Sequence, residues 1–163
     1  HLEALIESNI QVIWQTGKNY FADCKTALEK CQWLNTNSPI ICTDFVSQMP
    51  LAYALADLVI SRAGASSISE LCLLGKPAIL VPSPNVAEDH QTHNAMALVN
   101  KNAAVLVKDK DAQNNLIPIA LQLIKDNQKL LDLHTNILGL ALPDSARIIA
   151  AEVIKLATKN RNN

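Results

Sequence analysis

Five short apolar segments, separated by segments of helical spacing, constrain the fold of this chain more than any other feature. They are residues 11–15, 39–43, 58–61, 78–82 and 104–107. Apolar and polar residues do not alternate within them, which is typical of parallel strands buried on both faces. Strands that alternate with helices along a chain form a parallel sheet through right-handed crossovers. The sequence therefore predicts an α/β fold with a doubly wound parallel sheet.

The helical segments extend beyond the last strand. We expect helices over residues 1–8, 19–30, 50–56, 66–74, 91–101, 112–125, 128–139 and 145–159. The last three carry Leu and Ile at three- and four-residue spacing, so they predict a helical C-terminal tail. Neither an internal repeat nor a linker divides the 163 residues, and this length is typical of one domain with its own core.

Residues 58–70 contain the pattern that points most directly to a function. An apolar run leads into small residues and then a helix, and residues 61–70 read Ser-Arg-Ala-Gly-Ala-Ser-Ser-Ile-Ser-Glu. The free N–H groups at the start of a helix, together with its dipole, favour an anion such as phosphate. Glu70 lies within the second turn, where its carboxylate can accept hydrogen bonds from ribose hydroxyls. The pattern indicates a nucleotide site, in particular for a nucleotide sugar, although small residues also serve close helix–sheet packing.

A second polar segment follows the next strand. Gly75 can end the preceding helix in a left-handed conformation, and Pro77 prevents the helix from continuing. Residues 88–95 then read Glu-Asp-His-Gln-Thr-His-Asn-Ala and open another helix. Both polar loops lie at the carboxyl ends of parallel strands, which is where ligands bind in such sheets. Two adjacent polar loops favour a binding site more strongly than either loop alone.

The side chains of this second loop allow more than one role. His90 and Gln91 can hydrogen-bond sugar hydroxyls, or they can cap the helix that they open. His90 and His93 are three residues apart beside two carboxylates, so a metal site is also conceivable. No clear third ligand stands at a typical spacing, and we therefore favour an interpretation without metal.

Several other classes of function lack support. With only four glycines, the chain contains neither a G-x-G-x-x-G fingerprint nor a Walker A loop, and it has no G-x-S-x-G motif. The net charge of -1 gives no broad attraction to nucleic acid or anionic lipid. No apolar run approaches the ~18–20 residues that a membrane span needs. The four cysteines form no Cys-x-x-Cys pair, and the apolar neighbours of Cys42 and Cys72 favour buried free thiols. Free thiols weakly favour a reduced, cytosolic compartment.

Several segments carry a resemblance to a known family. They are residues 56–67, Glu70, residues 75–77, Pro82 and residues 89–95, together with residues 14–17, residues 45–49 and Tyr53. These segments resemble the donor-site half of the MurG family, the peptidoglycan N-acetylglucosaminyltransferases that use UDP-GlcNAc and a lipid-linked muramyl-peptide acceptor. The resemblance runs from about residue 11 to residue 107.

The resemblance implies a domain and an activity. Residues 1–163 would be a single C-terminal, donor-nucleotide-binding domain, the Rossmann-like half of an inverting glycosyltransferase of the GT-B type. The family's N-terminal acceptor domain and its first, glycine-rich phosphate loop are not in the chain, which begins at His1 and not at Met. We therefore expect this chain alone to bind donor weakly and to transfer no sugar.

The resemblance also implies roles for individual residues. The backbone of Val46, next to Phe45, would hold the uracil edge, and Glu70 would bind the ribose hydroxyls. The helix N-terminus at residues 65–67 would hold the diphosphate, so that no metal or other cofactor is needed. His90 and Gln91 would hold the GlcNAc. The candidate substrate-binding residues are Phe45, Val46, Arg62, Gly64, Ala65, Ser66, Ser67, Glu70, His90, Gln91 and Asn94.

The roles of Arg62, Asn94 and the segment 15–17 stay open, and no catalytic residue is assigned. Arg62 is either a phosphate contact or a surface cation, with its position before the loop slightly favouring the contact. Asn94 is expected to stabilise local backbone more than to touch ligand. Residues 15–17 either line the cleft or form an ordinary turn after a strand.

The expected partners follow from the resemblance. They are the UDP-GlcNAc donor and, through the N-terminal domain, a lipid-linked acceptor; nucleic acid and direct membrane insertion are not expected. The family's enzyme is expected in the cytoplasm, peripheral on the cytoplasmic face of the inner membrane. Two alternatives are a subunit of a split GlcNAc transferase of the N-glycan type and a non-catalytic nucleotide-binding module.

Overall fold

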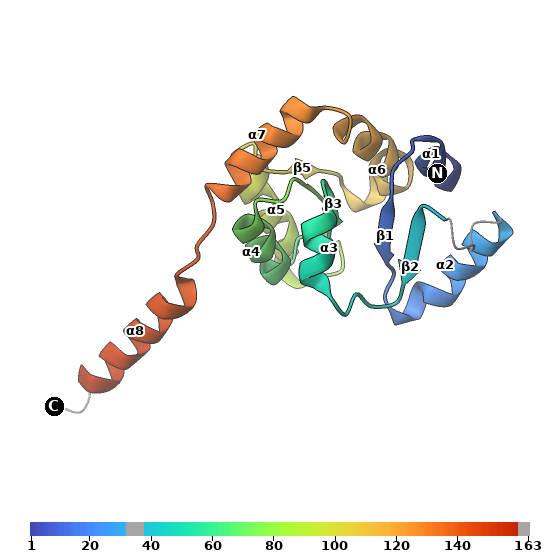
Figure 1. Ribbon diagram of the computed structural model, residues 1–163. Helices are drawn as coiled ribbons and strands as arrows, with labels where there is room; N and C mark the ends of the chain where they lie inside the picture. The colour runs from blue at the N-terminus through green and yellow to red at the C-terminus, as the bar shows by residue number, and fades with distance from the viewer. Residues whose placement is uncertain (32–37, 160–163) are drawn as a thin grey trace.

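A computed structural model describes residues 1–31 and 38–159, and these form an α/β fold (Figure 1). The elements are α1 (Leu2–Glu7), β1 (Val12–Gln15), α2 (Lys18–Lys30), β2 (Ile40–Thr43), α3 (Met49–Leu55), β3 (Val59–Ser61), α4 (Ala65–Leu74), β4 (Ala78–Leu80), η1 (Ala87–Asp89), α5 (His90–Val99), β5 (Val105–Leu106), α6 (Asp109–Leu123), α7 (Asn127–Leu138) and α8 (Ser145–Lys159). Every helix and strand expected from the sequence forms, with its ends shifted by at most a few residues. The α/β class and the helical tail are therefore confirmed.

The strands pair in two groups, and all the pairs are parallel. β1 pairs with β2 in register Val12↔Ile40, and β4 lies between β3 and β5 in the other sheet. Among the described residues, no hydrogen-bonded pair joins the two-stranded sheet to the three-stranded sheet. The parallel arrangement matches the sequence-based expectation, but the continuous sheet is replaced by two smaller ones.

The position of β4 in the middle of the three-stranded sheet explains why residues 78–81 are all apolar. Ala78 and Leu80 belong to a buried cluster with residues of α4 and α5, whereas Ile79 and Val81 belong to a second cluster with residues of α6 and α7. Successive side chains of a strand point to opposite faces, so both faces of β4 are covered. A strand covered on both faces needs apolar residues at every position.

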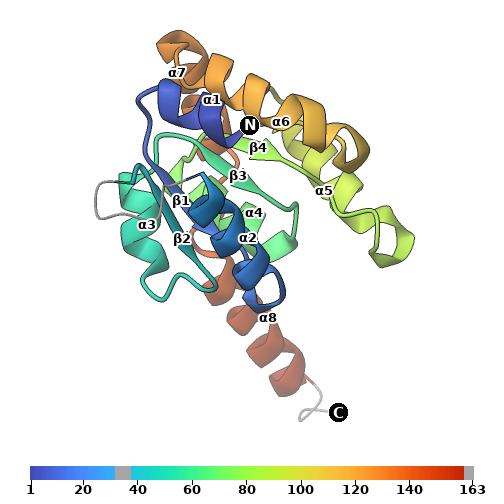
Figure 2. The same ribbon diagram turned by 90° about the vertical axis from the view of Figure 1, so that its right-hand side faces the viewer.

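The last helix behaves differently from α6 and α7, which pack on the three-stranded sheet. α8 projects away from the rest of the molecule in both ribbon views (Figure 1, Figure 2). All its residues from Ser145 to Thr158 are exposed, among them Ile149 at 64% and Ile154 at 63%. The tail is therefore helical as expected, but in the described part of the chain it covers no face of either sheet.

Gly75 ends α4 in a conformation that suits glycine. Its φ is 61°, in the left-handed region, and a Cβ built on it would lie 2.7 Å from Cε1 of His134 on α7. The Nδ1–H of His134 also donates to the Gly75 carbonyl oxygen at 2.6 Å, so the imidazole cannot move away without losing this bond. The turn between α4 and β4 is thus held against α7.

We predict that Gly75→Ala lowers the free energy of unfolding by at least about 1–2 kcal/mol, the cost of a left-handed residue with a side chain. The contact with His134 should add to this cost. Gly139→Ala is the matched control, because its φ is -63° and a new Cβ would make only ordinary contacts at 3.4 Å and 3.6 Å. Urea unfolding of both variants measures the difference, and equal losses would contradict the explanation.

Candidate functional site

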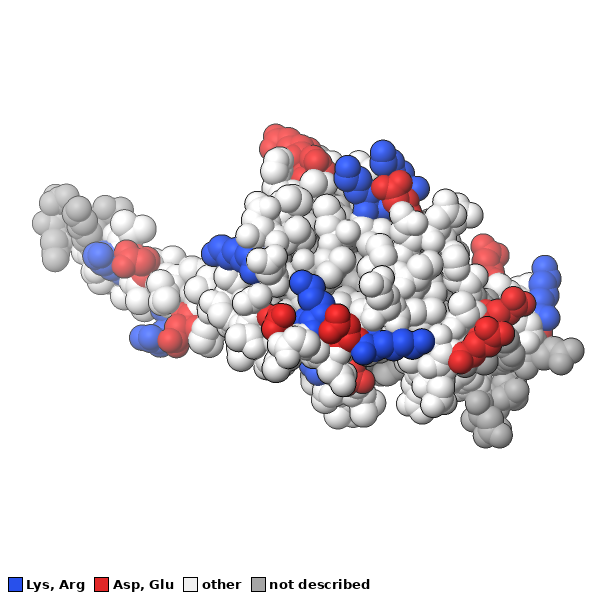
Figure 3. Space-filling model, turned by 90° about the horizontal axis from the view of Figure 1, so that it is seen from above, with Lys and Arg blue, Asp and Glu red and all other residues white. Residues whose placement is uncertain are grey.

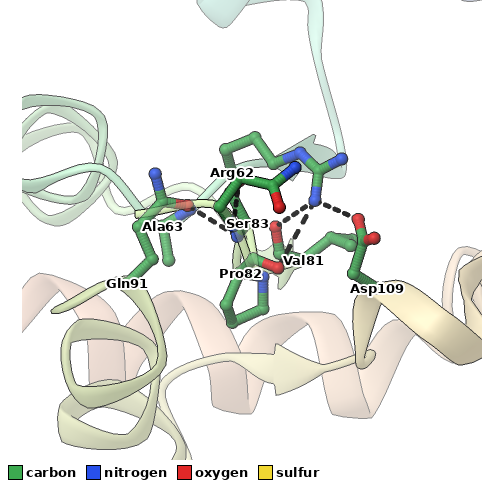
Figure 4. Close-up of polar contacts among 8 residues, drawn as sticks. Arg62, Ala63, Val81, Pro82, Ser83, Gln91 and Asp109 are labelled. Carbon is green, nitrogen blue, oxygen red and sulfur yellow. Dashed lines mark hydrogen bonds and ion pairs between the residues drawn. The ribbon is translucent and has the colours of Figure 1, made fainter. Parts of the chain in front are cut away.

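The candidate site lies at the carboxyl edge of the three-stranded sheet. The loop after β3 leads into α4, the loop after β4 leads into α5, and α6 starts shortly after β5. Side chains from these segments meet in one cluster of polar contacts (Figure 4). The two polar loops that the sequence placed at this edge are therefore adjacent, as expected.

The start of α4 offers uncapped N–H groups. Gly64 is the N-cap residue with φ -68° and ψ 146°, and no side chain caps the helix. The first intrahelical bond of this turn runs from the Ile68 N–H to the Gly64 carbonyl oxygen at 3.0 Å. The N–H groups of Ala65, Ser66 and Ser67 precede that bond and so lack intrahelical acceptors. Since Ala65 and Ser66 are exposed, an anion can reach them.

Gln91 connects the two loops through its side-chain oxygen. Its Oε1 accepts the N–H of Ala63 at 3.2 Å and the N–H of Ser83 at 2.9 Å (Figure 4). The amide oxygen is thus occupied by two backbone donors, and only the NH₂ group remains for a ligand. Any ligand atom that Gln91 binds must therefore be an acceptor. Capping of α5 does not explain this residue, because its oxygen bonds to the neighbouring loops.

Asn94 binds the carbonyl oxygen of Ala63, the residue whose N–H is bound by Gln91. Its Nδ2 donates to the carbonyl oxygen of Ala63 at 3.1 Å, while Gln91 accepts from the Ala63 N–H. The expected bond from Asn94 to local backbone is present, and a contact of Asn94 with ligand stays a prediction. Ala63 is fully buried, so leaving either of its backbone groups unpaired would cost free energy. Two side chains of α5 thus fix the residue that precedes the N-cap of α4.

The Arg62 side chain forms hydrogen bonds and an ion pair with other residues of the chain. Its Nη1 donates to the carbonyl oxygens of Val81 at 3.2 Å and Pro82 at 3.4 Å, and it forms an ion pair with Asp109 at the start of α6 (Figure 4). Arg62 therefore connects the ends of β3 and β4 to α6. A phosphate contact would have to use the other guanidinium nitrogens, and that role stays a prediction.

His90 is exposed and weakly held. Its Nε2 lies 3.5 Å from Oε2 of Glu88, and both side chains are mostly in solvent. Glu88 and Asp89 have positive φ values of 51° and 53°, which produce the tight turn before α5. Within residues 1–31 and 38–159, no three His, Cys, Asp or Glu side chains cluster as metal ligands do. His90 is free to turn toward a ligand at the loop after β4.

The segment expected to hold the uracil ring follows β2, a strand of the two-stranded sheet. Phe45 is 66% exposed, and the N–H of Val46 donates to Oε1 of Gln15 at 2.8 Å. Gln15 therefore contacts the loop after β2, and whether residues 15–17 line a ligand cleft stays a prediction. A base that uses the Val46 N–H must first displace the Gln15 side chain.

Glu70 lies at a hollow between α3 and α4. The hollow has a volume of about 450 Å³, and its lining is mainly apolar, with Met49, Leu73 and Leu74 among its residues. The hydroxyl of Tyr53 donates to Oε2 of Glu70 at 3.1 Å. Burial, followed by the hydrogen bond and charge of Glu70, raises the pKa of Tyr53 to about 12. The phenol therefore stays protonated at neutral pH and acts as the donor.

The charged side chains on the face shown in Figure 3 form no patch of a single sign that would indicate a ligand. In the face shown in Figure 3, Lys and Arg side chains are interspersed with Asp and Glu, and wide areas carry no charge. This distribution agrees with the net charge of -1. In the part of the chain that the structure describes, no helix is long and apolar enough to span a bilayer.

The chain belongs to the family defined by the glycosyltransferase family 28 C-terminal domain, whose sequence profile matches residues 1–146. This match covers both polar loops and all the residues assigned to the candidate site. It agrees with the resemblance found in the sequence.

Curated relatives and a solved structure support this membership. A protein of Bacteroides fragilis is 58% identical over 94% of this chain, and one of Parabacteroides distasonis is 53% identical over 97%. Both are named UDP-N-acetylglucosamine--N-acetylmuramyl-(pentapeptide) pyrophosphoryl-undecaprenol N-acetylglucosamine transferase. The chain spans 40% and 42% of their respective lengths. The crystal structure of Acinetobacter baumannii MurG is similar over 94% of this chain and 44% of its own, with a TM-score of 0.77 and 25% identity.

We predict that Gln91→Leu lowers the free energy of unfolding by about 1–3 kcal/mol, because the N–H groups of Ala63 and Ser83 lose their acceptor. Gln91→Glu keeps an acceptor oxygen for both N–H groups and should therefore destabilise the chain less than Gln91→Leu does. Denaturant unfolding of the two variants is the measurement. A Leu variant as stable as the parent would show that these two bonds do not hold the loops.

Proposed function

We propose that this chain binds UDP-GlcNAc and is the donor-binding domain of a transferase that adds GlcNAc to the lipid-linked muramyl-pentapeptide precursor of peptidoglycan. The observation that carries the proposal is the uncapped start of α4, held in place by α5, with Glu70 on the same helix. Family membership and the names of the two relatives support it.

The spacing along α4 suits a nucleoside diphosphate. Glu70 follows Ala65 by five positions, which corresponds to a rise of ~7.5 Å along the helix axis. The diphosphate would accept hydrogen bonds from the N–H groups of residues 65–67, and Glu70 would accept them from the ribose hydroxyls. The uracil ring would bind at the loop of Phe45 and Val46, where it would replace the Gln15 side chain as the acceptor of the Val46 N–H.

The sugar would lie against the start of α5. His90 is exposed there, and Gln91 has only its NH₂ group left for a ligand, so it would donate to a hydroxyl or carbonyl oxygen of GlcNAc. Arg62 would add a positive charge near the diphosphate through the guanidinium nitrogens that Asp109 does not use.

The proposed reaction is a displacement at the anomeric carbon. An acceptor hydroxyl attacks that carbon, the bond to the diphosphate oxygen breaks, and UDP leaves with the bonding electrons. The α4 dipole and N–H groups stabilise the negative charge that develops on the diphosphate, so this design needs no metal. A base removes the hydroxyl proton; we assign it, with the acceptor site, to the part of the relatives that this chain does not match. The reaction would take place at the cytoplasmic face of the inner membrane.

Titration with four nucleotides tests the donor assignment. Isothermal calorimetry of the purified chain should detect binding of UDP-GlcNAc, UDP-GalNAc and UDP, because all three carry the uridine diphosphate that most of the site contacts. ADP should bind much more weakly, since its base presents a different edge to the Val46 loop. Equal affinity for UDP and ADP would favour a general nucleotide-binding module.

Glu70→Ala should weaken UDP binding by about 1.5–3 kcal/mol, the range for hydrogen bonds to a charged group. Glu152→Ala on α8 removes the same charge from an exposed position far along the chain and should leave the affinity unchanged. Circular dichroism checks that both variants keep the fold. An unaltered UDP affinity in the Glu70 variant would remove this residue from the site.

A further inference from the structure

The hydrogen bond between Tyr53 and Glu70 joins two helices next to the proposed nucleotide site. Tyr53 lies on α3 and Glu70 on α4, and the two atoms are 3.1 Å apart. The Tyr53 ring is half-buried and packs against the core cluster of the three-stranded sheet. The phenol is therefore anchored by packing, whereas the Glu70 side chain reaches into solvent. Of the two partners, Tyr53 is the one that can hold the other in place.

This bond determines which part of the Glu70 carboxylate is free. Oε2 accepts from Tyr53, and no described hydrogen bond uses Oε1. A glutamate side chain without such a contact samples many rotamers, and ordering them opposes binding. Fixing one carboxylate oxygen leaves the other in a defined position before any ligand arrives.

The surroundings of the pair favour a stable orientation. Met49 and Leu73 line the hollow beside it, so apolar side chains flank the base of the exposed Glu70 side chain. The ammonium group of Lys76, at the same hollow, donates to the carbonyl oxygen of Ala56 at 2.9 Å, so its described partner is the residue that follows α3 and not Glu70. Tyr53 is thus the one described side chain that donates to the Glu70 carboxylate.

We propose that Tyr53 is a positioning residue of the nucleotide site: its hydroxyl orients Glu70 to accept hydrogen bonds from the 2′- and 3′-hydroxyls of ribose. Tyr53 thereby contributes to the preference for ribonucleotides over 2′-deoxyribonucleotides. The inference rests on the proposed function, because it assumes that Glu70 meets the ribose.

The experiment compares UDP with 2′-deoxy-UDP. Calorimetry measures both affinities for the parent chain, Tyr53→Phe, Glu70→Ala and the double variant. Tyr53→Phe keeps the ring and its packing and removes only the hydroxyl. We expect it to weaken UDP binding about three- to tenfold, the effect of one lost hydrogen bond, and to change 2′-deoxy-UDP binding less. In the Glu70→Ala background, Tyr53→Phe should have no further effect.

Tyr20→Phe is the matched control, because Tyr20 is the chain's other tyrosine and is 67% exposed on α2. It should leave both affinities unchanged, and thermal unfolding checks the stability of every variant. Equal weakening of UDP and 2′-deoxy-UDP by Tyr53→Phe would indicate a general structural role and overturn the inference.

Two other results separate the inference from the proposed function. If Glu70→Ala abolishes the preference for UDP but Tyr53→Phe does not reduce it, only the role of Tyr53 is wrong. If the parent chain binds neither nucleotide, or Glu70→Ala leaves the preference intact, the assignment of Glu70 fails and the role of Tyr53 fails with it.

Discussion

Ala63 is bound on both sides of its peptide backbone by side chains of α5, and the geometry of the candidate site depends on this arrangement. Gln91 accepts from its N–H, and Asn94 donates to its carbonyl oxygen. The next residue, Gly64, is the N-cap of α4, so these bonds determine where the free N–H groups of α4 point. Gln91 also accepts from Ser83, which places the loop after β4 relative to the same helix. One amide side chain therefore couples the proposed anion site to the loop proposed for the sugar.

The secondary structure could be predicted because its signals are local. Apolar runs of four or five residues, Gly75 and the spacing of Leu and Ile are all properties of neighbouring residues, and each predicted element is present. The division into two sheets could not be predicted in this way. Which strands share hydrogen bonds depends on how distant segments meet, and β1 and β3 are separated by two helices and a strand. For the same reason the sequence could not show that α8 projects from the molecule.

In the candidate site, too, the features that depend on neighbouring residues could be predicted, whereas the contacts between distant segments could not. The start of α4 and Glu70 belong to one strand–loop–helix unit, so their proximity follows from the helix that carries them. The partners that hold the site are distant in sequence: 47 residues separate Arg62 from Asp109, and 31 separate Gln15 from Val46. Asp109 and Ser83 carry no pattern that marks them as part of a site. The donor and acceptor roles of the Gln91 amide became clear only once its two backbone partners were placed.

α4 is fixed at both ends, which affects the thermodynamics of any ligand that binds its N-terminus. At the far end, His134 donates to the carbonyl oxygen of Gly75, and in between Leu71 and Cys72 are buried in the core. A helix held in this way keeps its dipole and N–H groups in one orientation whether or not an anion is present. The entropy lost in ordering these groups then belongs to the folding of the chain and not to the binding of the ligand. An anion that reaches α4 meets donors that need no reorganisation, and the main opposing terms are its own immobilisation and dehydration.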